Sequence, residues 1–377
     1  ELNGKPQTIT ITQNLKDVIL KKIVTFYPDG HYDLKIKLSK NVGYYLAVGY
    51  EPQAAVNMYA FHGAILEKKD GSLEKIEDGD AENDTFNDIK IAAMVDQYYT
   101  TFMYNLENPM KVIETSDNSK DNVPVLYIEG KQNLSLSGYI GPKYVELLKN
   151  INPELTKVVE YGLITFIAKP MFSVLALLYN VVHNWGIAII LFVILVRIIL
   201  FPLTYRGMVS MYKMKEMAPK MKELKEKYGK DPQKFQMKMM ELYKKEGANP
   251  LGGCLPMLLQ IPIFFAIYRV LINAIELKGA SFLWISDLSS MDPYFILPVL
   301  MGITMYLHQR VTPNNFSDPM QEKIFKFLPV IFTLFFFTFS AGLVLYWTTN
   351  NILSFLQQLI INKKMETLKK IKKESEK

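Results

Sequence analysis

Residues 184–205 constrain the fold of this chain more than any other part of it. They read NWGIAIILFVILVRIILFPLTY, an apolar run long enough to cross a lipid bilayer. The run carries one full charge, Arg197, which in a helix lies about 20 Å from residue 184 and about 12 Å from residue 205. A cation at that depth costs about 2.5–3.5 kcal/mol, so Arg197 is a candidate functional residue.

Charge is distributed unevenly along the chain. Residues 1–150 hold sixteen Lys and no Arg against twenty-one Asp and Glu, a net charge of −5, whereas residues 205–247 carry +6 and residues 362–377 carry +4. Basic segments flanking apolar spans are typical of cytoplasmic loops, and this distribution favours a membrane protein over a nucleic-acid binder. The single Cys254 excludes an internal disulfide. Because the sequence opens with Glu1, we expect an export signal or anchor upstream.

Residues 1–150 alternate apolar and polar side chains between turn-forming residues. This pattern predicts β-strands. The predicted strands are residues 18–26, 32–39, 64–68, 73–76, 92–104, 123–129 and 134–140. We therefore expect an antiparallel β-sandwich, and its acidic balance places it outside the cytoplasm.

Residues 151–183 change to a helical period. Apolar residues recur at spacings of three and four from Leu155 to Ile167, which predicts an amphipathic helix with a kink at Pro170. Two interpretations remain open. The helix lies in the outer membrane interface and leads into the first span, or it packs on the β domain.

The core, residues 184–361, contains five apolar segments that fit membrane spans. They are residues 184–204, 254–274, 294–308, 324–340 and 341–361. Between the first two, residues 205–247 predict a cytoplasmic helical hairpin, in which Gly229 ends one helix and Asp231 and Pro232 begin the next. Residues 362–377 form a basic cytoplasmic tail. The fold class is an α+β membrane protein with an extracytoplasmic β-sandwich and a five-helix core.

The spans lack the residues that most membrane and enzyme chemistry needs. They contain no Asp or Glu, and the chain has no Gly-rich phosphate loop, no nucleophile elbow, no CxxC pair and no His cluster. We expect no enzyme activity, no cofactor and no metal. Arg197 must then bind neutral acceptors or water in a cavity, or reach the inner headgroups. Candidate polar residues near it are Trp347, Thr349, Asn350, Gln260 and Gln309.

Methionine is concentrated in the hairpin, which holds eight of the nineteen Met residues. Flexible thioether side chains suit a surface that accepts many apolar sequences, so we predict substrate capture by part of this set. The predicted residues are Met208, Met211, Met214, Met217 and Met221. The alternative is a packed seam between the hairpin helices. The interleaved lysines fit anionic lipid, RNA phosphate or an ordinary solvated face.

A series of motifs runs in unbroken order between residues 141 and 361. They are NWG (184–186), LVRIILFPL (195–203), NPLGGCLP (249–256), QIPIF (260–264), WISDL (284–288), DPY (292–294), DPMQ (318–321) and GLVLYW (342–347). This series resembles the YidC family of membrane protein insertases. Residues 1–150 are similar to the family's periplasmic β-sandwich, with weaker motifs.

The resemblance implies a hydrophilic groove that opens to the cytoplasm and the lipid of the bacterial inner membrane. Arg197 and Trp347 correspond to groove residues, while Val193 stands where some members carry Thr. The implied partners are nascent membrane proteins and lipid, with the Sec translocon and the ribosome as further candidates, and no small-molecule substrate. From the residues alone, a small-solute channel or transporter and an assembly chaperone within a translocase remain alternatives.

Overall fold

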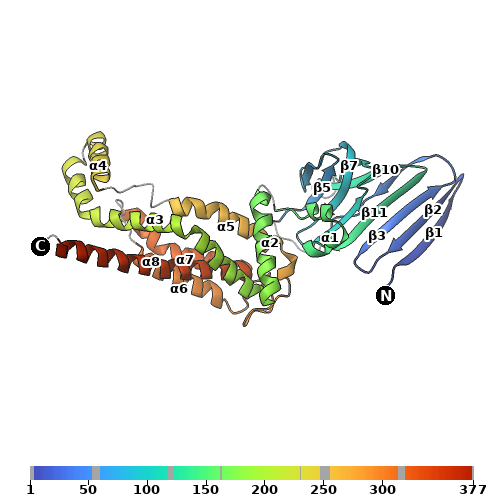
Figure 1. Cartoon of the computed structure of the whole chain (residues 1–377). Helices are drawn as coiled ribbons and strands as arrows, with labels where there is room; N and C mark the ends of the chain where they lie inside the picture. Colours follow the sequence, from blue (N-terminus) through green and yellow to red (C-terminus); the bar gives the residue numbers. More distant parts are fainter. Residues whose placement is uncertain are drawn as a thin grey trace. The chain divides into compact units, whose positions relative to one another are not determined.

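The computed structural model describes residues 4–52, 60–117, 122–161, 164–229, 231–246, 255–312 and 319–375. The chain divides into two compact units (Figure 1). Unit 1 comprises Glu1–Thr165 with Ile272–Glu276, and unit 2 comprises Phe166–Leu271 with Leu277–Lys377. The first boundary therefore falls at Thr165, later than the predicted residue 150.

Unit 1 is an antiparallel β domain. Its strands are β1 (Gln7–Leu15), β2 (Val18–Phe26), β3 (His31–Leu38), β4 (Gly43–Ala47), β5 (Gly63–Lys68), β6 (Leu73–Glu77), β7 (Thr85–Val95), β8 (Tyr99–Tyr104), β9 (Met110–Asp117), β10 (Val123–Lys131) and β11 (Asn133–Pro142). Among the described residues they pair in the order β1-β2-β3-β11-β8-β7-β9-β10-β4, and β5 joins β7 to β6. Every pairing is antiparallel, as the sequence predicts.

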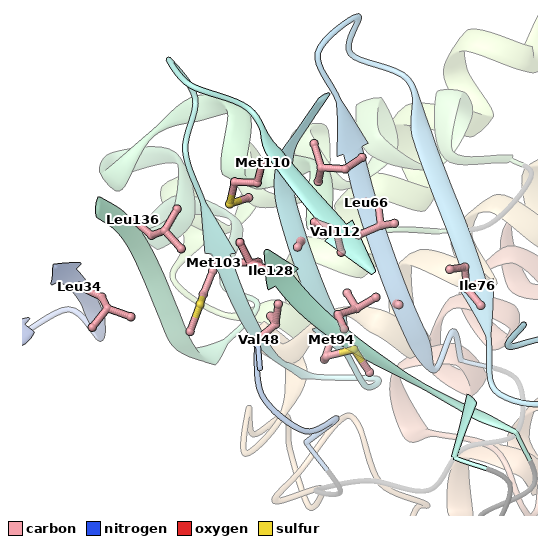
Figure 2. Packing of buried hydrophobic residues seen from close by; sticks show 14 of the residues in the cluster. Leu34, Val48, Leu66, Ile76, Met94, Met103, Met110, Val112, Ile128 and Leu136 are labelled. Carbon is pink, nitrogen blue, oxygen red and sulfur yellow. The ribbon is translucent and has the colours of Figure 1, made fainter. Parts of the chain in front are cut away.

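The core of unit 1 follows from the two-residue period of its strands. In β3, Leu34 and Ile36 are buried while Lys35 and Lys37 are exposed. Inward-facing side chains of β5, β7, β8, β9, β10 and β11 join them in one cluster, part of which is drawn in Figure 2. Burying each such side chain contributes about 1.5–3 kcal/mol, so this cluster holds the strands together.

Some strand predictions need correction. The predicted strand 92–104 is two strands, because Asp96 turns the chain by accepting hydrogen bonds from the backbone N–H groups of Tyr98 and Tyr99, at 2.7 and 2.6 Å. Strands β1, β4 and β9 have no counterpart among the predicted strands. In β1 all nine residues are exposed, so this strand buries no apolar face that would mark its position in the chain.

The single amphipathic helix predicted over residues 151–183 is wrong for its first half. The structure has α1 (Val145–Ile151), a 3-10 helix η1 (Pro153–Val158), and then α2 (Thr165–Val182). The side chain of Asn152 accepts from the N–H of Glu154 at 2.9 Å and so starts the 3-10 turn.

This first half belongs to the β unit. Leu155, Val158 and Val159 are buried, and Lys157 and Glu154 form ion pairs with Glu67 and Lys90 of the β domain. The alternative of packing on the β domain is therefore correct up to Val159. Residues 162 and 163 lie outside the described part of the chain. The kink residue Pro170 lies within α2.

Unit 2 is helical. Besides α2, its helices are α3 (Trp185–Tyr228), α4 (Pro232–Glu246), α5 (Leu255–Asn273, whose last two residues belong to unit 1), α6 (Ile296–Val311), α7 (Pro319–Phe336) and α8 (Ala341–Ser375). The 3-10 turn η4 (Ile275–Leu277) has its first two residues in unit 1 and its last in unit 2. Each of the five predicted spans overlaps one of these helices.

The lengths of three helices differ from the prediction. The span 184–204 and the first hairpin helix are one continuous helix of 44 residues, α3, despite Pro202 and Pro219 inside it. Helix α7 covers residues 319–336 instead of 324–340, and α8 continues through the predicted basic tail.

The caps of the hairpin agree with the prediction. Gly229 is the C-cap of α3, and the carboxylate of Asp231 accepts from the N–H of Lys234 at 3.1 Å at the start of α4. Gly247, predicted to end the second helix, lies outside the described residues.

Apolar side chains cover outward-facing surfaces of unit 2. On α7, Ile324, Phe327, Ile331 and Leu334 recur at spacings of three and four, and each is more than half exposed. Two described helices, α2 and α3, are long and apolar enough to cross a membrane, with mean hydropathies of 1.5 and 2.9 in their most apolar windows. The contiguous exposed apolar row on α7 suits contact with lipid or another apolar partner.

Candidate functional site around Arg197

Arg197 of α3 is held by side chains of α8. Its Nε and Nη2 atoms donate to Oδ1 of Asn350 at 3.0 and 2.8 Å, and Nη2 also donates to the backbone oxygen of Asn350 at 3.2 Å. Nη2 also reaches the hydroxyl of Ser354, and Nη1 donates to Oε1 of Gln357 at 3.4 Å. The guanidinium is thus directed at the neighbouring helix, which argues against the snorkelling alternative.

Helical periodicity explains why α8 supplies these acceptors. Asn350, Ser354 and Gln357 are spaced by four and three residues, so they lie on one face of the helix. The amide of Gln357 also donates to Oγ1 of Thr204 at 2.9 Å, which extends the polar contact along α3. Together these bonds form one polar seam between two mostly apolar helices.

The acceptors of Arg197 are all neutral. Asparagine and glutamine amides, a serine hydroxyl and a backbone carbonyl satisfy the donors without cancelling the positive charge. Among the described residues Arg197 forms no ion pair. This agrees with the absence of Asp and Glu from the predicted spans. A permanent, half-buried positive charge therefore remains available to an anionic group that enters the seam.

The other predicted groove residues are spread over different contacts. The ring of Trp347 meets Phe264 edge-on at 4.6 Å and lies 5.3 Å from Phe336, in an aromatic cluster of α5, α7 and α8. Gln260 donates to the hydroxyl of Tyr346 at 3.3 Å, and Gln309 donates to the carbonyl of Phe325. Thr349 is half-buried beside Asn350. Of the predicted set, the structure brings only Asn350 to Arg197.

Ser354, Gln357 and Thr204 are not among the residues predicted from the sequence. The candidate residues predicted on the last span end at Asn350, although the residues four and seven positions further along the helix are also polar. Reading the helical period on from Asn350 would have found Ser354 and Gln357. The contribution of Thr204 depends on how α3 packs on α8 and had no local signal.

The methionine prediction needs correction. Met208 and Met217 are buried, and Met211, Met214 and Met221 are half-buried, so this row is not an open surface. The ion pair between Glu216 and Lys369, at 2.7 Å, ties the same stretch of α3 to α8. In the hairpin, Met237 and Met240 of α4 are the methionines with an exposed fraction of 54%.

Known protein families match parts of the chain that correspond to both units. Residues 177–370 match the family described as "60Kd inner membrane protein", and residues 11–174 match the "YidC periplasmic domain". The chain belongs to the YidC family.

Named relatives cover nearly the whole chain. The "Membrane protein insertase YidC" of Wolinella succinogenes is 56% identical over 373 residues, which cover 98% of this chain and 69% of that protein. The protein of the same name in Helicobacter pylori is 55% identical over 383 residues, covering 99% of this chain and 70% of that protein. A solved structure titled "Active YidC insertase crystal structure with the first transmembrane domain resolved" covers 93% of this chain and 78% of that chain, with 21% identity and a TM-score of 0.46.

Membership of the YidC family fixes the setting of the site. Together with the apolar helices of unit 2, it identifies the chain as an inner membrane protein whose β unit corresponds to the family's periplasmic domain. An exposed apolar row such as that on α7 suits contact with the lipid of this membrane. The polar seam around Arg197 is a part of unit 2 that an apolar environment does not explain.

Proposed function

We propose that this chain is an insertase and chaperone that receives nascent membrane proteins and passes them into the lipid. The observation that carries this proposal is the charge of Arg197, whose acceptors among the described residues are all neutral groups between α3 and α8. The names of its relatives support the same activity. In this proposal the client's polar segment enters at the seam, while its apolar helix leaves along the apolar faces of unit 2.

The charge lowers the largest cost of insertion. An Asp at the centre of a span costs about 2.5–3.5 kcal/mol. A carboxylate about 4 Å from Arg197 gains about 4 kcal/mol at an effective dielectric constant of about 20. The two terms are of similar size, so the seam offsets the desolvation of one acidic side chain. Because the acceptors of Arg197 are neutral, the incoming carboxylate has no ion pair to displace.

Two short helices reduce the thickness of bilayer that the client's polar segment must cross. Helices α6 and α7 have 16 and 18 residues, equivalent to about 24 and 27 Å, against about 30 Å for a typical hydrocarbon core. We expect the bilayer to be thinner beside them. Once the polar segment has crossed, transfer of the client's apolar helix into lipid supplies the driving force, and no nucleotide is required.

The orientation we propose follows the distribution of charge. The basic hairpin 205–247 and the basic end of α8 lie in the cytoplasm, and the acidic β unit lies on the other side. In this orientation the polar seam opens toward the cytoplasm and the lipid. Nascent membrane proteins then meet the hairpin first, where Met237 and Met240 offer exposed apolar contact. The Sec translocon and the ribosome are candidate partners because the chain belongs to the YidC family.

Arg197→Ala tests the proposal. The purified protein is placed in liposomes, and protease protection scores the insertion of two single-span clients that differ only in having an acidic or a neutral translocated tail. We expect the acidic client to insert about tenfold less efficiently and the neutral client to be little affected. Arg206→Ala is the matched control, because Arg206 is an exposed arginine of the same helix.

Undiminished insertion of the acidic client by Arg197→Ala would exclude a role for the charge. If the Arg197→Ala variant folds normally but inserts neither client, Arg197 would instead be a packing residue between α3 and α8.

A further inference from the structure

Unit 1 contains a second polar site, a cavity of about 240 Å³ lined mainly by carboxylates. Asp80, Glu82 and Asp84 come from the loop between β6 and β7, and Glu114 comes from β9. The three loop carboxylates are exposed and form no ion pair among the described residues. We refer to these four residues as the acidic cavity.

The other charged residues of the lining are already paired. Glu74 accepts from Lys68 at 2.7 Å, and Lys75 lies 3.0 Å from Glu160. Neither pair neutralises the acidic cavity, because each lysine is matched by a carboxylate of its own. The cavity therefore keeps a net negative charge.

Glu114 is the residue that points to a ligand. It is only 1% exposed, and its Oε1 has no hydrogen-bond partner, while its other oxygen accepts from the N–H of Asp84 at 3.3 Å. A buried carboxylate oxygen without a donor costs free energy, and burial raises the pKa of Glu114, with the charges of Asp84 and Glu82 adding to the effect. A cation that enters the cavity would satisfy this oxygen with a charge-assisted hydrogen bond.

The size and lining of the acidic cavity indicate which kind of cation it binds. No group of three or more His, Cys, Asp or Glu side chains in the described residues converges closely enough to hold a metal ion. The cavity is also smaller than the roughly 300–1,000 Å³ typical of sites for drug-sized ligands. Ile76 and Phe86 add apolar surface to the lining, which suits the aliphatic stem of a long basic side chain.

The edge of the sheet at β6 gives a second reason to expect a peptide ligand. Strand β6, which carries Ile76, pairs only with β5 among the described strands, so no described strand pairs with its other edge. Backbone groups on an open edge can pair with an extended peptide, and such a peptide directs alternate side chains to one face. We propose that the acidic cavity binds a lysine or arginine side chain of an extended polypeptide partner that pairs with the edge of β6.

A binding measurement on the whole chain tests this. The protein is placed in nanodiscs of neutral phosphatidylcholine, which avoids competition from anionic lipid. Fluorescence anisotropy then follows a labelled octapeptide of alternating Lys and Thr, with an octapeptide of alternating Glu and Thr as the negative probe. We expect binding of the basic peptide only, weakening as salt rises from 50 to 300 mM.

Two variants and one control locate the binding. We expect Glu114→Gln, and separately the triple change Asp80→Asn, Glu82→Gln and Asp84→Asn, to weaken binding at least tenfold. The control removes the same number of exposed carboxylates elsewhere, Asp17→Asn, Asp88→Asn and Glu107→Gln, and should stay within twofold. If Glu114→Gln alters the thermal melt, the triple variant, whose changes are on an exposed loop, decides the result.

Three outcomes would overturn the inference. One is equal weakening by the cavity triple and the control triple, which would mean binding to the overall negative charge. Another is calcium binding at micromolar concentration that Glu114→Gln abolishes, which would make the site a metal site. The third is tighter binding of spermidine than of the peptide, which would remove the role of the β6 edge.

Discussion

Asn350→Asp changes the charge of the polar seam while keeping its shape. Asn350 presents Oδ1 to Nε and Nη2 of Arg197 at 3.0 and 2.8 Å, and an aspartate of the same size can accept the same two bonds. With the charge centres about 4 Å apart, the new pair gains about 4 kcal/mol at an effective dielectric constant of about 20. The seam becomes neutral, and its packing is retained.

A neutral seam no longer attracts an acidic client. A client carboxylate that would have gained about 4 kcal/mol from Arg197 now meets a compensated charge, and its own repulsion from the new aspartate adds to the loss. Water in the seam screens part of this, so we expect a decrease of at least tenfold in insertion of the acidic-tailed client. The neutral-tailed client should insert at the rate of the unmodified protein, because its path does not use the charge.

The assay is the protease-protection measurement in liposomes with the matched client pair. Asn362→Asp serves as the control, since it adds the same charge to α8 about 18 Å further along, beyond a Debye length of about 8 Å at physiological salt. Unchanged insertion of the acidic client by Asn350→Asp, with a normal thermal melt, would refute the reasoning that an uncompensated charge is what the site offers. An equal loss in the control would mean that any added carboxylate on α8 is harmful.

Two further predictions concern stability. Gly302 of α6 leaves no room for a Cβ beside the hydroxyl of Thr333 on α7, so we expect Gly302→Ala to cost about 1–3 kcal/mol in a detergent melt, and Thr333→Ala to restore it. Full additivity of the two changes would contradict this contact. Burial, with the neighbouring Glu51, raises the pKa of Asp78 to about 6. The folded state then binds the proton more tightly than the unfolded state, so stability should rise as pH falls from about 7 to about 4. Asp78→Asn should flatten that dependence in urea melts, and an unchanged slope would disprove it.

The sequence was most informative where the period of apolar residues is long and regular. The helices from α3 to α8 overlap all five predicted spans, because a run of about twenty apolar residues has few other stable solutions in lipid. The caps at Gly229 and Asp231 were also predictable, since capping depends on residues only three or four positions apart. Local rules succeeded where the decisive contacts are local.

Predictions failed where burial decides the structure. Residues 155–159 carry a helical pattern, yet they form a 3-10 turn and irregular chain, because Lys157 and Glu154 pair with the β domain and draw this segment onto it. Met208 and Met217, predicted on an accessible surface, are likewise buried on α3. In both cases the side chains are compatible with two environments, and only packing selects one.

For the site around Arg197, the sequence predicts some features, and only the packing of the helices decides the others. The sequence alone determined that Arg197 lies in an apolar span and that no acidic residue of the spans can neutralise it, which left neutral acceptors, water or the inner headgroups. Only the tertiary structure decided which acceptors these are. Asn350, Ser354 and Gln357 lie more than 150 positions from Arg197, and their contact depends on how two helices pack along their length. Composition fixes what a charge requires, whereas the register between α3 and α8 fixes what it touches.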